Sequence, residues 1–462
     1  MLRLAADDAS KAALTGWLAM VLLAAALIIG GGGTPAPRPE LALECFAALI
    51  AVLWVTVAAP KAALRAIPRS VWLIAAVLAG LPLAQLIPLP PAVWQALPGR
   101  EIEREALSLI DQDATWRPWT VAPLRTLSAF LSLGPPLLLL LLTAMLGRRA
   151  RLRLVGVVAA VGLLSIVIGA LQLLASDDSP LRFYGLTTPQ LTGFQANHNS
   201  TADLLLIALV AVSVLLRAAG EQQRAPANPA VVLGLAGLAN ALFVIGVVLT
   251  ASRMGIFLLP VALLASLWIL RPWLSVSRRM LLGGIASLAV LALLVVLLAR
   301  GNAAFGAIAA RFDFTDELRP QLWQDGLFVV RQHLPFGVGM GNFAPALVAN
   351  ERIEAVRPFL TNRAHNDFIE LAAEAGLFGM LALAAISGLL GRAIWRAIRS
   401  SGTGMPSTAV FALATLLILA LHSLVDYPLR SMSLAGLAAV CAGLLLAPRS
   451  AASENPVAGD KW

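Results

Sequence analysis

Residues 363–391 read RAHNDFIELAAEAGLFGMLALAAISGLLG, a polar stretch that leads directly into a long apolar run. Similar apolar runs of about 20 residues recur along the chain between short arginine-rich loops, a pattern typical of transmembrane helices. Of the 462 residues, 59% are hydrophobic and only 13% are charged, whereas a soluble domain carries roughly 25% charged residues. We therefore predict an all-α, polytopic membrane fold with about twelve transmembrane helices.

Basic residues in alternate loops predict the orientation of these spans. We place the spans near residues 12–31, 41–59, 71–89, 127–146, 154–175, 199–216, 230–250, 254–270, 280–299, 367–391, 407–425 and 432–447. With the N-terminus inside, one set of short loops holds basic clusters such as those at 61–69 and 148–153, and the opposite short loops hold almost none. By the positive-inside rule, both termini are then cytoplasmic. All four histidines fall on the outer side or within about a turn of it, which favours chemistry at the outer surface over chance.

Two expected outer segments, 90–126 and 300–366, are too long to be simple turns. Long semi-polar segments of this kind are usually functional or disordered. The second contains aromatic residues and helix-like stretches over 311–332, so we predict a folded cap on the outer face. The tail at 448–462 is predicted to be a disordered cytoplasmic end.

The charge balance and the cysteines limit the possible functions. A net charge of +9 could indicate a nucleic-acid binder, but the arginines are scattered through many short loops instead of forming one patch. Both cysteines, Cys45 and Cys441, fall inside apolar spans, so we expect neither a disulfide framework nor a cysteine-metal site. The chain also lacks HExxH, CxxC and Walker patterns, so no metal or cofactor is implied.

The polar stretch before the span at 367–391 combines helix-capping residues with acids. Asn366 or Asp367 can cap the helix, and Asp367 with Glu370 has the spacing of a capping box. Asp367, Glu370 and Glu374 share one helical face. A carboxylate that faces lipid costs about 2.5–3.5 kcal/mol, so we expect this face to look into protein or a wet cavity.

His365 would lie at the mouth of the same helix. A neutral imidazole in that position could take a proton from a hydroxyl. The alternative interpretation is a simple helix cap with a histidine at the surface.

Arginines in the expected outer segments are candidates for binding an anion. Arg253 lies in a very short turn, LTASRMGIF (249–257), where its guanidinium could bind phosphate through two hydrogen bonds or anchor the helix at the interface. Arg319 and Arg331 lie in ELRPQLWQDGLFVVRQHLPFGVGMGNF (317–343), where they could also be solvated helix residues. The glycines of that stretch predict a tight irregular turn, and no strand precedes them as a nucleotide loop requires.

Two further stretches place histidine and asparagine beside expected spans. In LTGFQANHNSTADLL (191–205), Asn197 and Asn199 could cap a helix or hydrogen-bond sugar hydroxyls. In HSLVDYPLR (422–430), His422 and Asp426 lie one turn apart if the helix persists, and Pro428 is expected to end that helix.

Taken together, these motifs resemble the O-antigen ligase and polymerase superfamily of bacterial inner-membrane glycosyltransferases. The resemblance covers most of the chain and depends on the order and spacing of the motifs. The matching pieces are QLIPLPPAVW (85–94), GFQANHN (193–199), TASRMG (250–255), RPQLW (319–323), PFGVGMGNF (335–343), AHNDFIELAAEAGLFG (364–379) and HSLVDYPLR (422–430). In the asparagine-rich motif this chain departs from the pattern, because Ser200 stands where many relatives have histidine.

The resemblance implies a periplasmic active site and a lipid-linked donor. Such proteins transfer a glycan from undecaprenyl pyrophosphate, without a metal, to an acceptor that is lipid A-core or another lipid-linked saccharide. By resemblance, Arg253 and Arg319 bind the pyrophosphate and His365 is the base or orients the acceptor. The other candidates for substrate contact are Asn197, Asn199, Asn366, Glu370, Arg331 and His422. Residues 1–190 are then the N-terminal membrane region and residues 191–447 the catalytic region.

Other functions remain as alternatives. The order of Arg253, Arg319 and His365 is ligase-like, which puts a ligase slightly ahead of a polymerase for O-antigen, capsule or exopolysaccharide. A transporter of about twelve spans usually joins two similar halves, and we find no such similarity here. A purely structural subunit predicts that His365→Ala leaves glycan output unchanged. Attack opposite the lipid phosphate would invert the anomeric centre, and a product with retained configuration would contradict that step.

Overall fold

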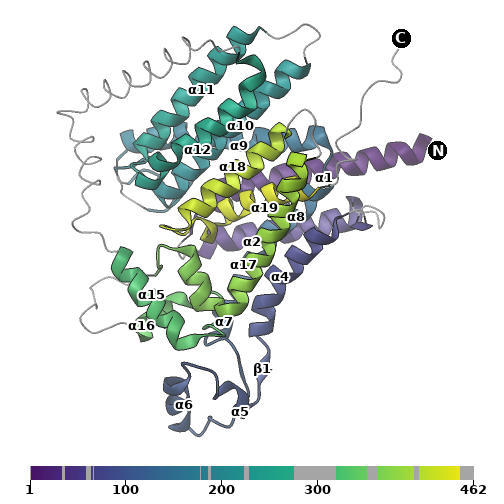
Figure 1. Ribbon diagram of the computed structural model, residues 1–462. Coiled ribbons are helices and arrows are strands. Elements are labelled where there is room, and N and C mark those ends of the chain that lie inside the picture. Colours follow the sequence, from purple (N-terminus) through teal and green to yellow (C-terminus); the bar gives the residue numbers. More distant parts are fainter. Residues whose placement is uncertain are drawn as a thin grey trace, which may run out of the picture. The chain divides into compact units, whose positions relative to one another are not determined.

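The computed structural model divides the chain into two compact units (Figure 1). One unit comprises Met1–Leu154 and Arg319–Trp462, and the other comprises Val155–Leu318. The described residues are 2–33, 37–58, 64–65, 67–176, 178–185, 189–222, 228–274, 319–350, 362–399 and 405–447. The predicted span at 280–299 and the predicted tail at 448–462 lie outside these residues.

Each of the other predicted spans coincides with one helix or with two consecutive helices. The first unit holds α1 (Leu2–Ile29), α2 (Pro37–Leu53) with a π-helical turn (Trp54–Ala58), α4 (Arg69–Gln85), α7 (Pro123–Ser132), α8 (Gly134–Met145), α17 (Asp367–Arg399), α18 (Ser407–His422) and α19 (Met432–Leu446). Helix α9 (Arg148–Leu174) begins in the first unit and ends in the second, which holds α10 (His198–Gln222), α11 (Pro229–Leu249) and α12 (Arg253–Leu270).

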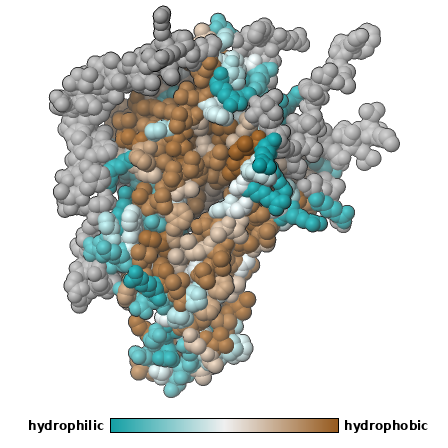
Figure 2. Space-filling model, viewed as in Figure 1, coloured by the Kyte–Doolittle hydropathy of each residue, from teal (hydrophilic) through white to brown (hydrophobic). Residues whose placement is uncertain are grey.

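Length and composition support membrane insertion of these helices. Among the described residues, 8 helical stretches are long and apolar enough to cross a membrane, and α4, α18 and α19 are shorter apolar helices. Their outward faces carry large apolar side chains such as Trp17, Leu73, Leu238, Phe257 and Leu381, and Figure 2 shows apolar residues over much of the visible surface. Soluble proteins rarely expose so much contiguous apolar area. The all-α membrane fold is therefore confirmed, and the number of spans stays a prediction.

The expected outer segment 90–126 is folded. It contains α5 (Pro91–Trp94), α6 (Glu101–Ser108) and the short strand β2 (Arg117–Pro118), which pairs antiparallel with β1 (Pro88–Leu89) just before the segment. The buried Arg100 ties this segment together, because its guanidinium bonds the Trp119 carbonyl and the Glu103 carboxylate.

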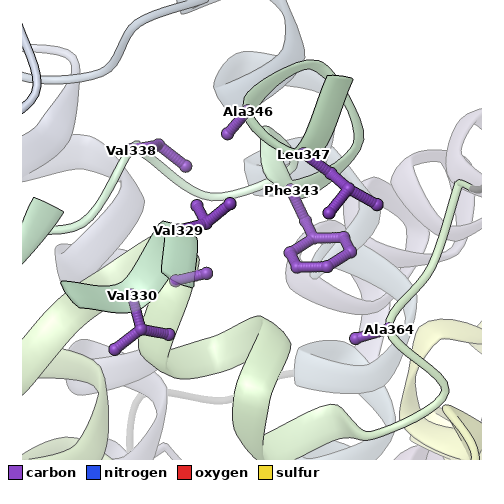
Figure 3. Close-up of a cluster of buried hydrophobic side chains, with 8 residues drawn as sticks. Val329, Val330, Val338, Phe343, Ala346, Leu347 and Ala364 are labelled. Atoms are coloured by element: carbon purple, nitrogen blue, oxygen red, sulfur yellow. The ribbon is translucent and has the colours of Figure 1, made fainter. Parts of the chain in front are cut away.

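The described part of the expected cap packs on α17. Helices α15 (Arg319–His333) and α16 (Phe343–Ala349) join a buried apolar cluster with the start of α17. Figure 3 shows this cluster around Phe343. Its buried members are Val329, Val330, Val338, Phe343, Ala346, Leu347, Ala364 and Ala373. Burial of apolar surface therefore fixes the cap against the segment that carries His365.

Helix α17 is interrupted at Gly376, whose φ is 54° and ψ −144°. The interruption frees carbonyl groups that would otherwise bond within the helix, and the turn after α15 bonds to them. The Val338 amide donates to the Ala373 carbonyl (2.9 Å), the Gly339 amide to Glu374 (2.8 Å), and the Leu377 amide to Pro335 (2.8 Å). Broken helices at membrane depth need partners of this kind, because lipid offers no hydrogen bonds.

Glycine allows the turn 335–341 to approach α17 so closely. Gly337, Gly339 and Gly341 all have positive φ, which confirms the predicted irregular turn. Gln85, fully buried at the end of α4, completes the junction: its Nε2 donates to the Glu374 carbonyl (3.1 Å) and its Oε1 accepts from the Met340 amide (2.8 Å). The motif at 85–94 therefore begins with a residue that holds the glycine turn on the broken helix.

Gly376→Ala should destabilise the first unit. A Cβ at this position would lie 2.1 Å from the Pro335 carbonyl oxygen, and the backbone would still need a positive φ. Strain of this kind costs about 1–3 kcal/mol, so the thermal unfolding midpoint in detergent, followed by tryptophan fluorescence, should fall. Gly388→Ala in the same helix is the matched control, since nothing lies within 4 Å of its added carbon. Equal midpoints for the two variants would contradict the role of the interruption.

Candidate active site

Asn366 begins α17 as its N-cap. Its Oδ1 accepts hydrogen bonds from the Phe368 amide (2.9 Å) and the Ile369 amide (3.0 Å), and its Nδ2 donates to the Leu424 carbonyl (2.8 Å). The capping box predicted for Asp367 and Glu370 is therefore wrong, because Asp367 is the first helical residue. These contacts give the side chain of Asn366 a role in the fold, and its predicted contact with substrate stays a prediction.

His365 is held in an unusual backbone conformation immediately before this cap. Its φ is +50°, a left-handed value that few residues other than glycine adopt. The indole Nε1 of Trp323 in α15 donates to the His365 carbonyl (3.3 Å), and the ring of Tyr427 meets the imidazole edge to face at 5.0 Å. Backbone strain that surroundings enforce in this way is concentrated at functional sites.

The imidazole of His365 is paired with the carboxylate of Asp426. The Nδ1 of His365 lies 2.9 Å from Oδ1 of Asp426. The histidine side chain is 32% exposed, and the aspartate side chain only 3%. An ionised carboxylate can only accept, so Nδ1 carries the proton and Nε2 is left as the basic nitrogen. A carboxylate that fixes the tautomer of a histidine is the arrangement of a general base.

Positive charges around Asp426 keep its carboxylate ionised. Burial raises the pKa of Asp426, but the hydrogen bond from His365 and the charges of His365, His422 and Arg319 lower it further, to about 2. Arg319 and His422 therefore act on the same carboxylate that orients His365. The structure brings these three predicted residues together around Asp426.

Asp426 is not among the site residues that the sequence predicts, although it lies in the matching motif HSLVDYPLR (422–430). The expected span at 407–425 ends earlier, at His422, and Pro428 begins a 3₁₀ turn (Pro428–Arg430) instead of ending the helix. One further helical hydrogen bond, from the Asp426 amide to the His422 carbonyl (2.9 Å), keeps the two residues adjacent. The spacing of four positions between His422 and Asp426 indicated that these two residues are neighbours, but it gave no sign of the contact between Asp426 and His365.

The acids of α17 share one buried face, and this face looks into protein, one of the two expected environments. Arg430 meets all three: its Nε lies 3.7 Å from Asp367 and 3.2 Å from Glu370, and its Nη1 lies 2.8 Å from Glu374. Glu370 is fully buried and also pairs with Arg363 (3.3 Å). This burial favours a structural role for Glu370 over the direct substrate contact predicted from sequence.

The second half of α15 carries Arg331 and His333, of which the first is exposed and the second is buried. Arg331 is exposed, so it is accessible to a ligand, and its predicted role in binding substrate stays a prediction. His333 is buried, with its Nδ1 2.9 Å from the Val329 carbonyl and its ring against Gly99. Burial lowers the pKa of His333, which favours a neutral packing residue.

The second unit places the asparagine-rich motif and the Arg253 turn at the same end. The Leu191 amide donates to the Leu249 carbonyl (3.0 Å), so the two segments are directly bonded. Asn197 caps α10, because its Oδ1 accepts from the Asn199 amide (2.8 Å). Arg253 begins α12, which Ser252 caps through the Gly255 amide (3.1 Å).

Gln172 of α9 fixes the approach to this motif. The buried amide of Gln172 donates to the carbonyls of Leu181 and Gly193, both at 2.8 Å, and accepts from the Gly193 amide (2.8 Å) and the Thr192 hydroxyl (2.9 Å). A side-chain amide that satisfies this many backbone groups stiffens the segment that leads into Asn197.

Comparison with protein families identifies the central part of the chain. Residues 238–384 match a family model described as O-Antigen ligase. These residues are similar to an O-antigen ligase domain. No curated protein matches the chain. This family implies a membrane glycosyltransferase-like ligase or polymerase that uses lipid-linked saccharides.

The matched segment contains Arg253, Arg319, Arg331 and His365. Asn197 and Asn199 precede it, and His422 and Asp426 follow it. His365, the candidate base, thus lies inside the matched segment, whereas its carboxylate partner Asp426 lies outside it. Arg253 belongs to the second unit and His365 to the first, so their predicted assembly into one site stays a prediction.

Asp426 should stabilise the fold at neutral pH and lose this effect in acid. Its pKa in the fold is about 2, below the ordinary value of 3.8, so the unfolded chain binds the proton more readily than the folded one. The stabilisation is present above about pH 4 and is lost as the pH falls toward 2. The difference in thermal midpoint between wild type and Asp426→Asn should therefore shrink below about pH 4. A difference that grows there would contradict the assignment.

Proposed function

We propose that the chain is an O-antigen ligase-like glycosyltransferase at the periplasmic face of the bacterial inner membrane. It moves a glycan from undecaprenyl pyrophosphate to a hydroxyl of lipid A-core, and needs no metal or cofactor. The observation that carries the proposal is the pairing of His365 with Asp426 beside the charge of Arg319, in a chain whose central part is similar to an O-antigen ligase domain.

The pairing suits His365 to act as a general base. In the tautomer that Asp426 favours, Nδ1 donates to the carboxylate and Nε2 can accept the proton of an acceptor hydroxyl. The hydroxyl oxygen then bonds to the anomeric carbon of the donor, while the bond from that carbon to the lipid pyrophosphate breaks. Asp426 stabilises the imidazolium that forms. General base catalysis of this kind contributes roughly 10²–10⁴-fold to a rate.

The leaving group needs positive charge, and two arginines are proposed to supply it. The lipid pyrophosphate departs with the electron pair of the broken bond, so its negative charge grows in the transition state. The charge of Arg319 lowers the pKa of Asp426, which supports a role for this guanidinium near the base. Arg253 begins a helix at the end of the second unit and is proposed to be the second ligand. Loss of one such donor costs roughly a hundredfold or more.

The orientation predicted from the basic loops agrees with a periplasmic site. On the positive-inside topology, both termini are cytoplasmic, and the segments around His365, Asp426 and Arg253 lie outside. In the first unit, the two expected outer segments contact each other, since the Val121 amide donates a hydrogen bond to the Val338 carbonyl (3.0 Å). The clustering of these segments supports alternation of the spans across the membrane.

A deletion strain complemented with variants tests the proposal. His365→Ala should abolish long-chain lipopolysaccharide while lipid-linked polymer accumulates, and Asp426→Asn should reduce ligation because the imidazole loses its orienting partner. With purified protein, release of undecaprenyl pyrophosphate should fall roughly 10²-fold or more for His365→Ala and for Arg319→Ala.

Arg392→Ala is the matched control, since this arginine is exposed near the other end of α17, and its activity should equal that of wild type. Accumulation of single lipid-linked repeats would identify a polymerase instead. Unchanged glycan output in His365→Ala would identify a structural subunit, and transport of labelled substrate without release of undecaprenyl pyrophosphate would identify a transporter.

A further inference from the structure

Arg430 is the centre of a buried ion cluster behind the proposed active site. It lies on the 3₁₀ turn Pro428–Arg430, and its Nε and Nη1 reach the three carboxylates of α17 at 3.7, 3.2 and 2.8 Å. Two of these carboxylates, Glu370 and Glu374, have no exposed side-chain surface. The guanidinium is therefore a bridge between α17 and the turn that follows Asp426.

Glu370 joins this cluster to the loop that carries His365. Its Oε2 faces Arg430, and its Oε1 accepts a hydrogen bond from the Ala364 amide at 2.9 Å. Ala364 is buried and directly precedes His365. The same carboxylate also meets Arg363 at 3.3 Å, so it fixes two consecutive residues before the imidazole.

Asp367 joins the cluster to the segment that carries Asp426. Its Oδ2 accepts from the Ser423 hydroxyl (2.8 Å) and from the Leu429 amide (3.2 Å). Its own amide donates to the Ser423 carbonyl (3.0 Å). Ser423 and Leu429 lie three residues before and after Asp426, so Asp367 holds that segment from both sides.

Burial of so many charges costs stability, because an apolar core of similar volume is often as stable or more so. Helix capping is already provided by Asn366 and does not require the cluster. The geometry of the ion cluster instead suits it to hold the loop that carries His365 at a fixed position relative to the segment that carries Asp426. Lysine is not equivalent to Arg430, since the donors of an ammonium group radiate from one nitrogen, whereas a guanidinium spreads its donors over three nitrogens in a fixed plane.

We propose that Arg430 is a positioning residue that sets the separation and orientation of His365 and Asp426 through Glu370 and Asp367. It touches no reacting atom. Its effect on turnover rests on the proposed function, whereas its effect on the His365–Asp426 hydrogen bond does not.

Arg430→Lys in the full-length protein tests the proposal in two independent ways. We expect kcat to fall about 10- to 100-fold, because a displacement of about 1 Å at a reacting group has an effect of that size. The KM for the lipid-linked donor should change little, since the arginines proposed to bind pyrophosphate are intact. Arg392 is an exposed arginine of α17, so Arg392→Lys is the matched control and should resemble wild type in both constants.

The second measurement is the nuclear magnetic resonance spectrum of labelled histidine, which needs no activity. The chain has 4 histidines. The imidazole signal that is missing from the spectrum of His365→Ala is therefore the signal of His365. Wild type and Arg392→Lys should show the Nδ1-protonated tautomer bonded to a carboxylate. Arg430→Lys should show a mixture of tautomers, because the hydrogen bond to Asp426 is weakened.

A folded Arg430→Lys variant with wild-type kcat and a wild-type His365 spectrum would overturn the proposal. If that variant does not fold, Glu370→Gln takes its place, because it keeps an oxygen for the Ala364 amide but loses the charge that faces Arg430. It should show the same changes in kcat and in the His365 spectrum, but smaller. Wild-type values for both measurements would overturn the proposal. If wild type itself transfers no glycan, the proposed function fails, and the His365 spectrum alone decides whether Arg430 positions the pair.

Discussion

The membrane environment requires that polar groups find their partners inside the protein, and this constraint shapes the whole first unit. Helix α17 breaks at Gly376, and the carbonyls of Ala373 and Glu374 that the break releases are bonded by the glycine turn. The acids on the same helix are matched by Arg430. The glycine turn and Arg430 both come from distant parts of the sequence, and both contact the first turns of α17.

The proposed active site follows from this arrangement. Because the cap is held on the broken helix, Trp323 reaches the His365 carbonyl and Arg319 comes close enough to influence Asp426. Because the ion cluster draws the 3₁₀ turn toward α17, Asp426 meets the imidazole. The contact with Asp426 occupies Nδ1 of His365 and leaves Nε2 for the proposed chemistry.

Charge and exposure divide the polar residues of the site by role. His365 is partly exposed and pairs with a buried carboxylate, as a proton acceptor at a surface requires. Glu370 and Glu374 are fully buried and paired with arginine, as a rigid support requires. Sequence spacing alone placed Asp367, Glu370 and Glu374 on one helical face, but it could not tell whether that face looked toward water or toward a cation.

The amino-acid sequence by itself determined the all-α membrane fold, the approximate position of nearly every described helix, the irregular glycine turn and the family that the central segment resembles. These features depend on composition, apolar run length and local backbone preference, which act over short stretches of chain. Only the tertiary structure decided that Asn366 bonds the Leu424 carbonyl, that Asp426 orients His365, and that Arg430 neutralises the acids of α17. Those pairings join residues about 60 positions apart, and such contacts depend on how helices pack, which no local pattern encodes.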